Sequence, residues 1–87
     1  MIENIKGFDK LRSLKELFLG NNKIKKIRCL DNLVNLEKLW LDENRLETIE
    51  GLQNLVKLKE LNLSGNKIEN IGMGLDGLVM LEDLNIS

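Results

Sequence analysis

The side chains that could perform chemistry in this 87-residue sequence are few and scattered. The chain has no histidine and one cysteine, Cys29. Nucleophilic catalysis needs a nucleophile beside a base, and structural zinc sites use four Cys or His ligands. Lysines and carboxylates do not cluster at a spacing that could replace these groups. We therefore expect no catalytic site, no metal and no cofactor, and we predict that the chain is not an enzyme.

Motifs that bind phosphates are also missing from the sequence. There is no GxxxxGK[ST] loop, and no GxGxxG directly follows a strand, as the dinucleotide-binding fingerprint requires. Residues 72–77 read GMGLDG, which has the GxGxxG spacing but lies in the stretch between two copies of the repeat. The charges nearly balance, with 13 basic and 14 acidic residues. One short basic cluster contains Lys23, Lys25, Lys26 and Arg28. Nucleic-acid binders usually carry a larger basic patch, so we interpret the cluster as a solvated loop and expect neither nucleic acid nor a small-molecule substrate.

Cellular location can be judged from the apolar pattern and from Cys29. No apolar stretch approaches the roughly 20 residues that span a bilayer, and no basic-then-apolar leader opens the chain. Cys29 has no second cysteine for an internal disulfide, which favours a reducing compartment. We expect a cytoplasmic protein without membrane contact. Because Cys29 lies between Ile27 and Leu30, we interpret it as a small buried filler.

The clearest signal in the sequence is a repeat of constant length. Asn22, Asn44 and Asn66 are evenly spaced along the chain. Around them the chain reads LRSLKELFLGNNKI, LVNLEKLWLDENRL and LVKLKELNLSGNKI, and a fourth copy opens as LVMLEDLNIS. The apolar residues are correspondingly uniform, with nineteen leucines and eight isoleucines against three valines and no alanine. This periodicity predicts a solenoid in which neighbouring repeats share one continuous core.

The repeat divides the chain into three full units and two partial ones. The full repeats are 11–32, 33–54 and 55–77, and the partial repeats are 1–10 and 78–87. The third repeat carries one extra residue at Gly72–Met73–Gly74, which we interpret as a tolerated insertion. Solenoids need a polar cap at each end. Since neither end shows such a cap, we expect the chain to be a fragment of a longer repeat protein.

Each copy contains a short segment in which leucines alternate with other residues, as Leu17 and Leu19 do. A period of two places both leucines on one face of a strand. The expected strands are 16–20, 38–42, 60–64 and 83–87. Equal repeat lengths place them side by side and parallel. The repeated asparagine then follows each strand, where its amide can satisfy backbone groups that the turn leaves unpaired. We assign Asn22, Asn44 and Asn66 this structural role.

The pattern LxxLxxLxLxxNxIxxIxxL resembles the leucine-rich-repeat family over essentially the whole chain. The 22-residue length is similar to that of the subfamily typified by a protein phosphatase 1 regulatory subunit and an outer-arm dynein light chain. The resemblance implies an α/β solenoid, namely a right-handed horseshoe with a concave parallel sheet and short 3₁₀ turns on its convex side. It also implies a protein–protein interaction module or scaffold that regulates a phosphatase or organises a dynein complex, in the cytoplasm, cilium or nucleus.

The strand alternation assigns Phe18 and Trp40 to one column of the concave face, side by side and followed by Asn62 and Asn85. Exposed adjacent aromatics are typical of binding hot spots. We therefore predict that another protein binds on this face. The predicted contact residues are Phe18, Trp40, Lys38, Asp42, Glu16, Glu60 and Asn62. Two other functions stay open: an interior spacer without its own site, and a repeat of a bacterial surface adhesin.

Charged residues on neighbouring strands alternate in sign, except that Asp83 repeats the acid of Glu60. One column reads Lys15, Glu37, Lys59 and Glu82, and the next reads Glu16, Lys38, Glu60 and Asp83. Opposite charges on adjacent strands contribute about 0.2–1 kcal/mol per pair. We interpret the columns as support for the strand register in preference to a docking site.

Overall fold

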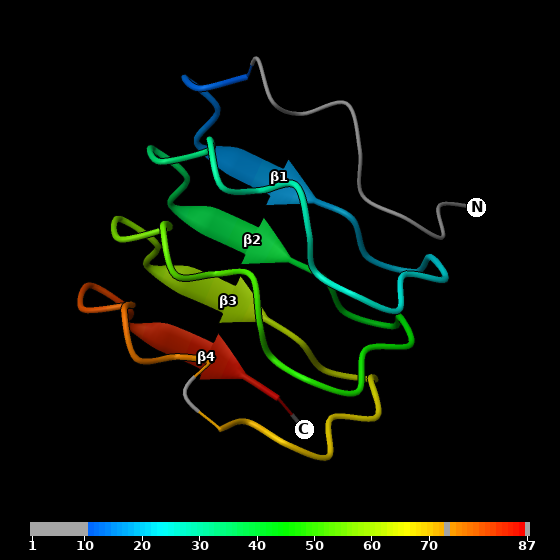
Figure 1. Cartoon of the computed structure of the whole chain (residues 1–87). Coiled ribbons are helices and arrows are strands. Elements are labelled where there is room, and N and C mark those ends of the chain that lie inside the picture. The colour runs from blue at the N-terminus through cyan, green and yellow to red at the C-terminus, as the bar shows by residue number, and fades with distance from the viewer. Residues whose placement is uncertain (1–10, 73, 87) are drawn as a thin grey trace.

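The computed structural model describes residues 11–72 and 74–86, and it shows four short strands stacked in one sheet (Figure 1). The strands are β1 (Glu16–Phe18), β2 (Lys38–Trp40), β3 (Glu60–Asn62) and β4 (Asp83–Asn85). Each strand pairs in parallel with the next one along the chain. The described residues contain no helix. The predicted solenoid of parallel strands is confirmed, while the proposed partial repeat 1–10, Met73 and Ser87 lie outside the described residues.

The strands begin where the alternation predicted and are shorter than expected. Backbone pairing nevertheless continues beyond β1, because the Leu19 N–H donates to the Trp40 carbonyl and the Asn21 N–H to the Asp42 carbonyl, both at 2.8 Å. The sheet also keeps its register across the longer third repeat, since Leu61 is paired with Leu84 as Leu39 is paired with Leu61. The extra residue is therefore absorbed in the segment between β3 and β4.

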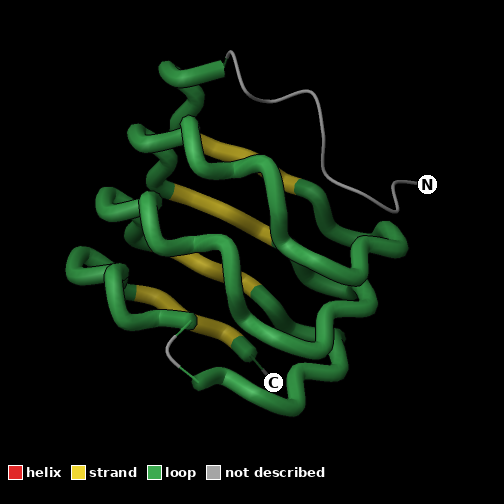
Figure 2. Tube along the Cα trace, viewed as in Figure 1, coloured by secondary structure: helices red, strands yellow, loops and turns green. Residues whose placement is uncertain are grey.

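A single leucine and isoleucine core lies between the sheet and the connecting segments that return to the next strand. Figure 2 shows these return segments running along one side of the sheet without helix. Leu39 and Leu41 of the second repeat are completely buried, as are Leu30 and Leu52 of the return segments. Inward-facing leucines from every repeat thus meet in one core, and each repeat is packed mainly by its neighbours.

Each return segment ends in two successive hydrogen-bonded turns before the next strand. The Leu33 N–H donates to the Leu30 carbonyl and the Leu36 N–H donates to the Leu33 carbonyl, both at 3.0 Å. The same pair of turns precedes β3 and β4. Each turn is closed by the i→i+3 hydrogen bond of a 3₁₀ helix, as in the short 3₁₀ turns that the resemblance implied. Among the described residues these turns stay single and do not continue into a 3₁₀ helix.

The asparagine amides that follow β2 and β3 tie the ends of these strands to the repeat before each of them. Asn44 Nδ2 donates to the carbonyl oxygens of Leu19 and Leu41, both at 3.0 Å. Its Oδ1 accepts the Ile24 N–H at 3.0 Å. Asn66 makes the equivalent contacts one repeat later. These bonds satisfy backbone groups that the turn would otherwise leave unpaired inside the core.

The environment of Cys29 differs from the expectation. Its side chain is exposed, and its φ of 64° lies in the left-handed region. Gly51, at the same place in the next repeat, has a φ of 75°. A left-handed residue redirects the chain between the buried Ile27 and Leu30, so the side chain points to solvent. The interpretation of Cys29 as a buried filler is wrong.

Candidate functional site: the open face of the sheet

Phe18 and Trp40 lie side by side on the sheet face that points away from the core, which we call the open face. They are register partners on β1 and β2, with ring centroids 5.2 Å apart and planes inclined by 68°. Phe18 is 55% exposed and Trp40 is 39% exposed. Edge-to-face aromatic pairs contribute about 0.5–1.5 kcal/mol beyond their burial. The two rings therefore form one exposed and mutually oriented apolar surface.

The orientation of the indole is fixed by Glu60 on the neighbouring strand. Trp40 Nε1–H donates to Glu60 Oε2 at 2.7 Å. Phe18 contacts the indole from one neighbouring strand and Glu60 holds its polar edge from the other. Beneath the pair, Leu17 and Leu39 point into the core, which anchors the backbone of both strands. A ring held in this way loses little conformational freedom when a ligand covers it.

Two ion pairs of the alternating columns are present in the described residues. Lys38 Nζ lies 3.9 Å from Glu16 Oε2, and Lys59 Nζ lies 4.0 Å from Glu37 Oε1. All four side chains are at least 38% exposed, so each pair contributes at most about 1 kcal/mol. Glu60, in the same column as Lys38, accepts a hydrogen bond from Trp40, so this carboxylate supports the aromatic pair.

A shallow hollow of about 300 Å³ opens beside Trp40, toward β4. Its polar lining comes from Glu60, Asn62, Asp83 and Asn85, with Trp40 forming the aromatic side. Asp83 and Asn85 were not among the predicted contact residues. The signal that identifies them is the register, because Asp83 is paired with Glu60 and Asn85 with Asn62. The aromatic pair therefore borders a hollow with acidic and amide groups.

Two of the predicted contact residues are turned toward the chain itself. Asn62 Oδ1 accepts the Ser64 N–H at 3.1 Å. The Asp42 carboxylate lies over Gly20, where an added Cβ would come within 2.5 Å of Asp42 Oδ1. These side chains shape the end of the strands, whereas Phe18 and Trp40 are the apolar groups that the open face offers to a ligand.

Asn22, like the two later asparagines, uses its amide within the turn. Its Nδ2 donates to the Leu19 carbonyl at 2.9 Å and to the Gly20 carbonyl at 3.2 Å. The repeated asparagines therefore bind backbone at the ends of the strands and do not line the hollow beside Trp40. Among the described residues, no cluster of three or more His, Cys, Asp or Glu side chains could hold a metal ion. The same part of the chain includes no helix that could cross a membrane.

The sequence profile for leucine-rich repeats, described as Leucine Rich repeats (2 copies), matches residues 12–54 and 34–78. Parallel strands at a constant repeat and the asparagine turns define the same class of protein. The matched residues cover more than half of the chain, and the chain belongs to the leucine-rich-repeat family.

Among solved structures, the chain is similar to an internalin from Listeria monocytogenes, with a TM-score of 0.83 and 33% sequence identity. The similarity covers 97% of this chain and 24% of the internalin, so the chain spans about a quarter of that protein's length. No curated protein matches the sequence. These comparisons show the family and support the fold. They do not confirm that the chain belongs to the subfamily typified by the phosphatase regulatory subunit and the dynein light chain.

Proposed function

We propose that this chain is a protein-interaction module whose partner binds on the open face of the sheet, centred on Phe18 and Trp40. Leucine-rich-repeat proteins are generally interaction modules without enzymatic activity, and the family match and the similarity to an internalin support this class of function. The observation that carries the choice of surface is the exposed Phe18–Trp40 pair, held in place by Glu60.

Phe18 and Trp40 offer a partner an apolar surface that water otherwise covers. The two adjacent rings are 55% and 39% exposed, so a partner can bury a substantial part of each. The rings are already oriented, so binding them costs little side-chain entropy. Replacing a tryptophan at the centre of an interface by alanine often weakens binding by about 2 kcal/mol or more. The acidic groups beside Trp40 favour a partner that surrounds its apolar anchor with basic side chains.

To test the proposal, peptides are first selected from a random displayed library for binding to the intact chain. Their affinity for variants of the chain is then compared with their affinity for the unchanged chain. Phe18→Ala with Trp40→Ala should weaken the selected peptides by at least about tenfold, equivalent to about 1.4 kcal/mol. The matched control is Val34→Ala with Val56→Ala, which removes apolar groups that are 41% and 46% exposed outside the sheet. Equal weakening by both double variants, or none by the aromatic one, would overturn the proposal.

The 33% identity with an internalin favours a second candidate, in which these repeats belong to a bacterial surface adhesin. A secretion leader and a wall anchor in the gene that encodes the repeats would support this candidate. The roles in phosphatase regulation and in dynein organisation rest on the length and pattern of the repeat. Affinity capture that returns a phosphatase catalytic subunit or a dynein heavy chain, and is lost in the aromatic double variant, would support them.

A further inference from the structure

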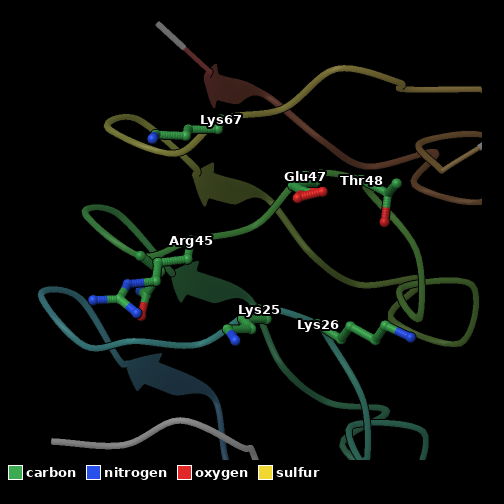
Figure 3. Close-up of a pocket in the computed structure, with 7 residues that line it drawn as sticks. Lys25, Lys26, Arg45, Glu47, Thr48 and Lys67 are labelled. Atoms are coloured by element: carbon green, nitrogen blue, oxygen red, sulfur yellow. The ribbon is translucent and has the colours of Figure 1, made fainter.

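The return side of the solenoid, opposite the open face, carries a second hollow of about 660 Å³ (Figure 3). Its lining includes the side chains of Lys25, Lys26, Arg45, Lys67, Glu47 and Thr48. In Figure 3 these side chains rise from three successive return segments. Four of them are basic and one is acidic. The hollow is therefore strongly basic in a chain whose formal net charge is only −1.

The basic groups come partly from a column that runs through the repeats. Lys23, Arg45 and Lys67 each follow one of the repeated asparagines, so they share the spacing of the repeat. The backbone holds this column in register, because the Arg45 N–H donates to the Ile24 carbonyl and the Lys67 N–H to the Leu46 carbonyl, both at 2.9 Å. Neighbouring strands in such a stack are about 4.8 Å apart. Three cations are thus placed in one row.

This row differs from the charge columns on the strands. There, acids and bases alternate, and two ion pairs are recorded, Lys38–Glu16 and Lys59–Glu37. None of the three cations in the row has an ion-pair partner within the described part of the chain. Like charges at adjacent positions of a sheet or helix destabilise it by fractions of a kcal/mol. Glu47 is the one carboxylate among the side chains that line the hollow, so an acidic ligand would offset the repulsion that remains.

We propose that this basic surface, formed by Lys23, Lys25, Lys26, Arg45 and Lys67, binds an acidic segment of a partner protein. A short acidic peptide matches the four cations that line the hollow, and Lys23 extends their row by one repeat. A nucleic acid fits this surface less well than an acidic peptide does. Nucleic-acid binders usually carry a longer stretch of basic residues, and the Glu47 carboxylate, which would repel phosphates, lies within this hollow. The surface is separate from the open face, so the chain can bind two protein segments on opposite sides.

The test uses a fluorescently labelled oligoglutamate peptide and measures its anisotropy against the 87-residue chain at low salt. Arg45→Gln with Lys67→Gln should weaken binding by at least about fivefold, since each exposed ion pair contributes up to about 1 kcal/mol. The charge-preserving pair Arg45→Lys with Lys67→Arg should retain binding. The matched control is Arg12→Gln with Lys15→Gln, which removes the same charge from exposed positions outside the hollow and should leave binding nearly unchanged.

Equal weakening by the control would overturn the proposal, because the peptide would then respond to net charge alone. Binding of a labelled DNA duplex with the same dependence on Arg45 and Lys67, without binding of oligoglutamate, would assign the surface to nucleic acid instead. Phe18→Ala with Trp40→Ala should not change oligoglutamate binding. This separates a failure of the basic surface from a failure of the open face.

Discussion

Asn44 is a polar residue inside an apolar core, only 7% exposed, and its amide is used in full. The amide nitrogen donates to carbonyl groups at the ends of two neighbouring strands, and the amide oxygen accepts a backbone N–H of the return segment. An amide side chain carries both an N–H donor and a carbonyl acceptor at its end. Asparagine and the longer glutamine are the two residues that have one. At the scale of single residues, this amide therefore holds the repeat in place together with the leucine core.

Asn44→Ala should reduce the free energy of unfolding by about 2–3 kcal/mol, because the Ile24 N–H and the Leu19 carbonyl would lose their partner inside the core. Asn54→Ala is the matched control, since the Asn54 amide makes only an exposed contact of 3.4 Å with the Asp31 carbonyl. The control should change stability by no more than about ±0.5 kcal/mol. Urea unfolding followed by circular dichroism measures both. Equal losses would contradict the structural role of the amide.

Residue spacing predicted which side chains face inward, but it did not predict every environment. Leu39 and Leu41 are buried as their alternation indicated, and Phe18 and Trp40 are exposed on the other face. The exposure of Cys29 depends on a positive φ at one turn residue. The spacing of apolar residues does not specify that angle. The sequence signal was the glycine that the other copies carry at the equivalent position, Gly7, Gly51 and Gly74, because glycine adopts positive φ most readily.

Strands in this fold are short and depend on their neighbours for stability. Leu39 and Leu61, at equivalent positions of β2 and β3, are 0% and 1% exposed. Leu84, the equivalent residue of β4, is 41% exposed. The inward-facing leucine of a strand is therefore covered fully only where the repeats on both sides contribute to the core.

Leu39→Ala should destabilise the chain by about 2–5 kcal/mol, because it leaves a cavity at a fully buried position. Leu84→Ala removes the same atoms at the same position of the repeat and should cost less than half as much, since water already reaches Leu84. Hydrogen exchange should likewise be faster in β4 than in β2. Equal losses of stability and equal protection would show that the core beside β4 is covered in the isolated chain.

The order, direction and starting positions of the strands could be predicted from the constant period of the sequence, because equal repeats must stack in register. The basic surface on the return side was missed. Its cluster near Lys25 was visible in the sequence, but Arg45 and Lys67 are distant along the chain and approach it only through the stacking of repeats. Aligning the residue after each asparagine was the signal that could have revealed it.

The molecule as a whole presents two surfaces of different chemistry on opposite sides of one core. The open face has an aromatic pair with acidic and amide groups beside it. The return side has a row of cations. Because stacking repeats place equivalent residues in rows, a change of one residue per repeat alters a whole row while the core stays the same. The core thus fixes the fold, and the outward-facing rows determine what the chain can bind.

Accessibility of Trp40 to a quencher is the measurement that tests binding at the open face most directly. Trp40 is the only tryptophan in the chain, so its fluorescence reports this site alone. A saturating peptide without tryptophan, selected on the intact chain, should reduce quenching by acrylamide and shift the emission to shorter wavelength, because a partner excludes water from the centre of its interface. Unchanged quenching and emission at saturation would contradict the assignment of Phe18 and Trp40 as the centre of the binding site.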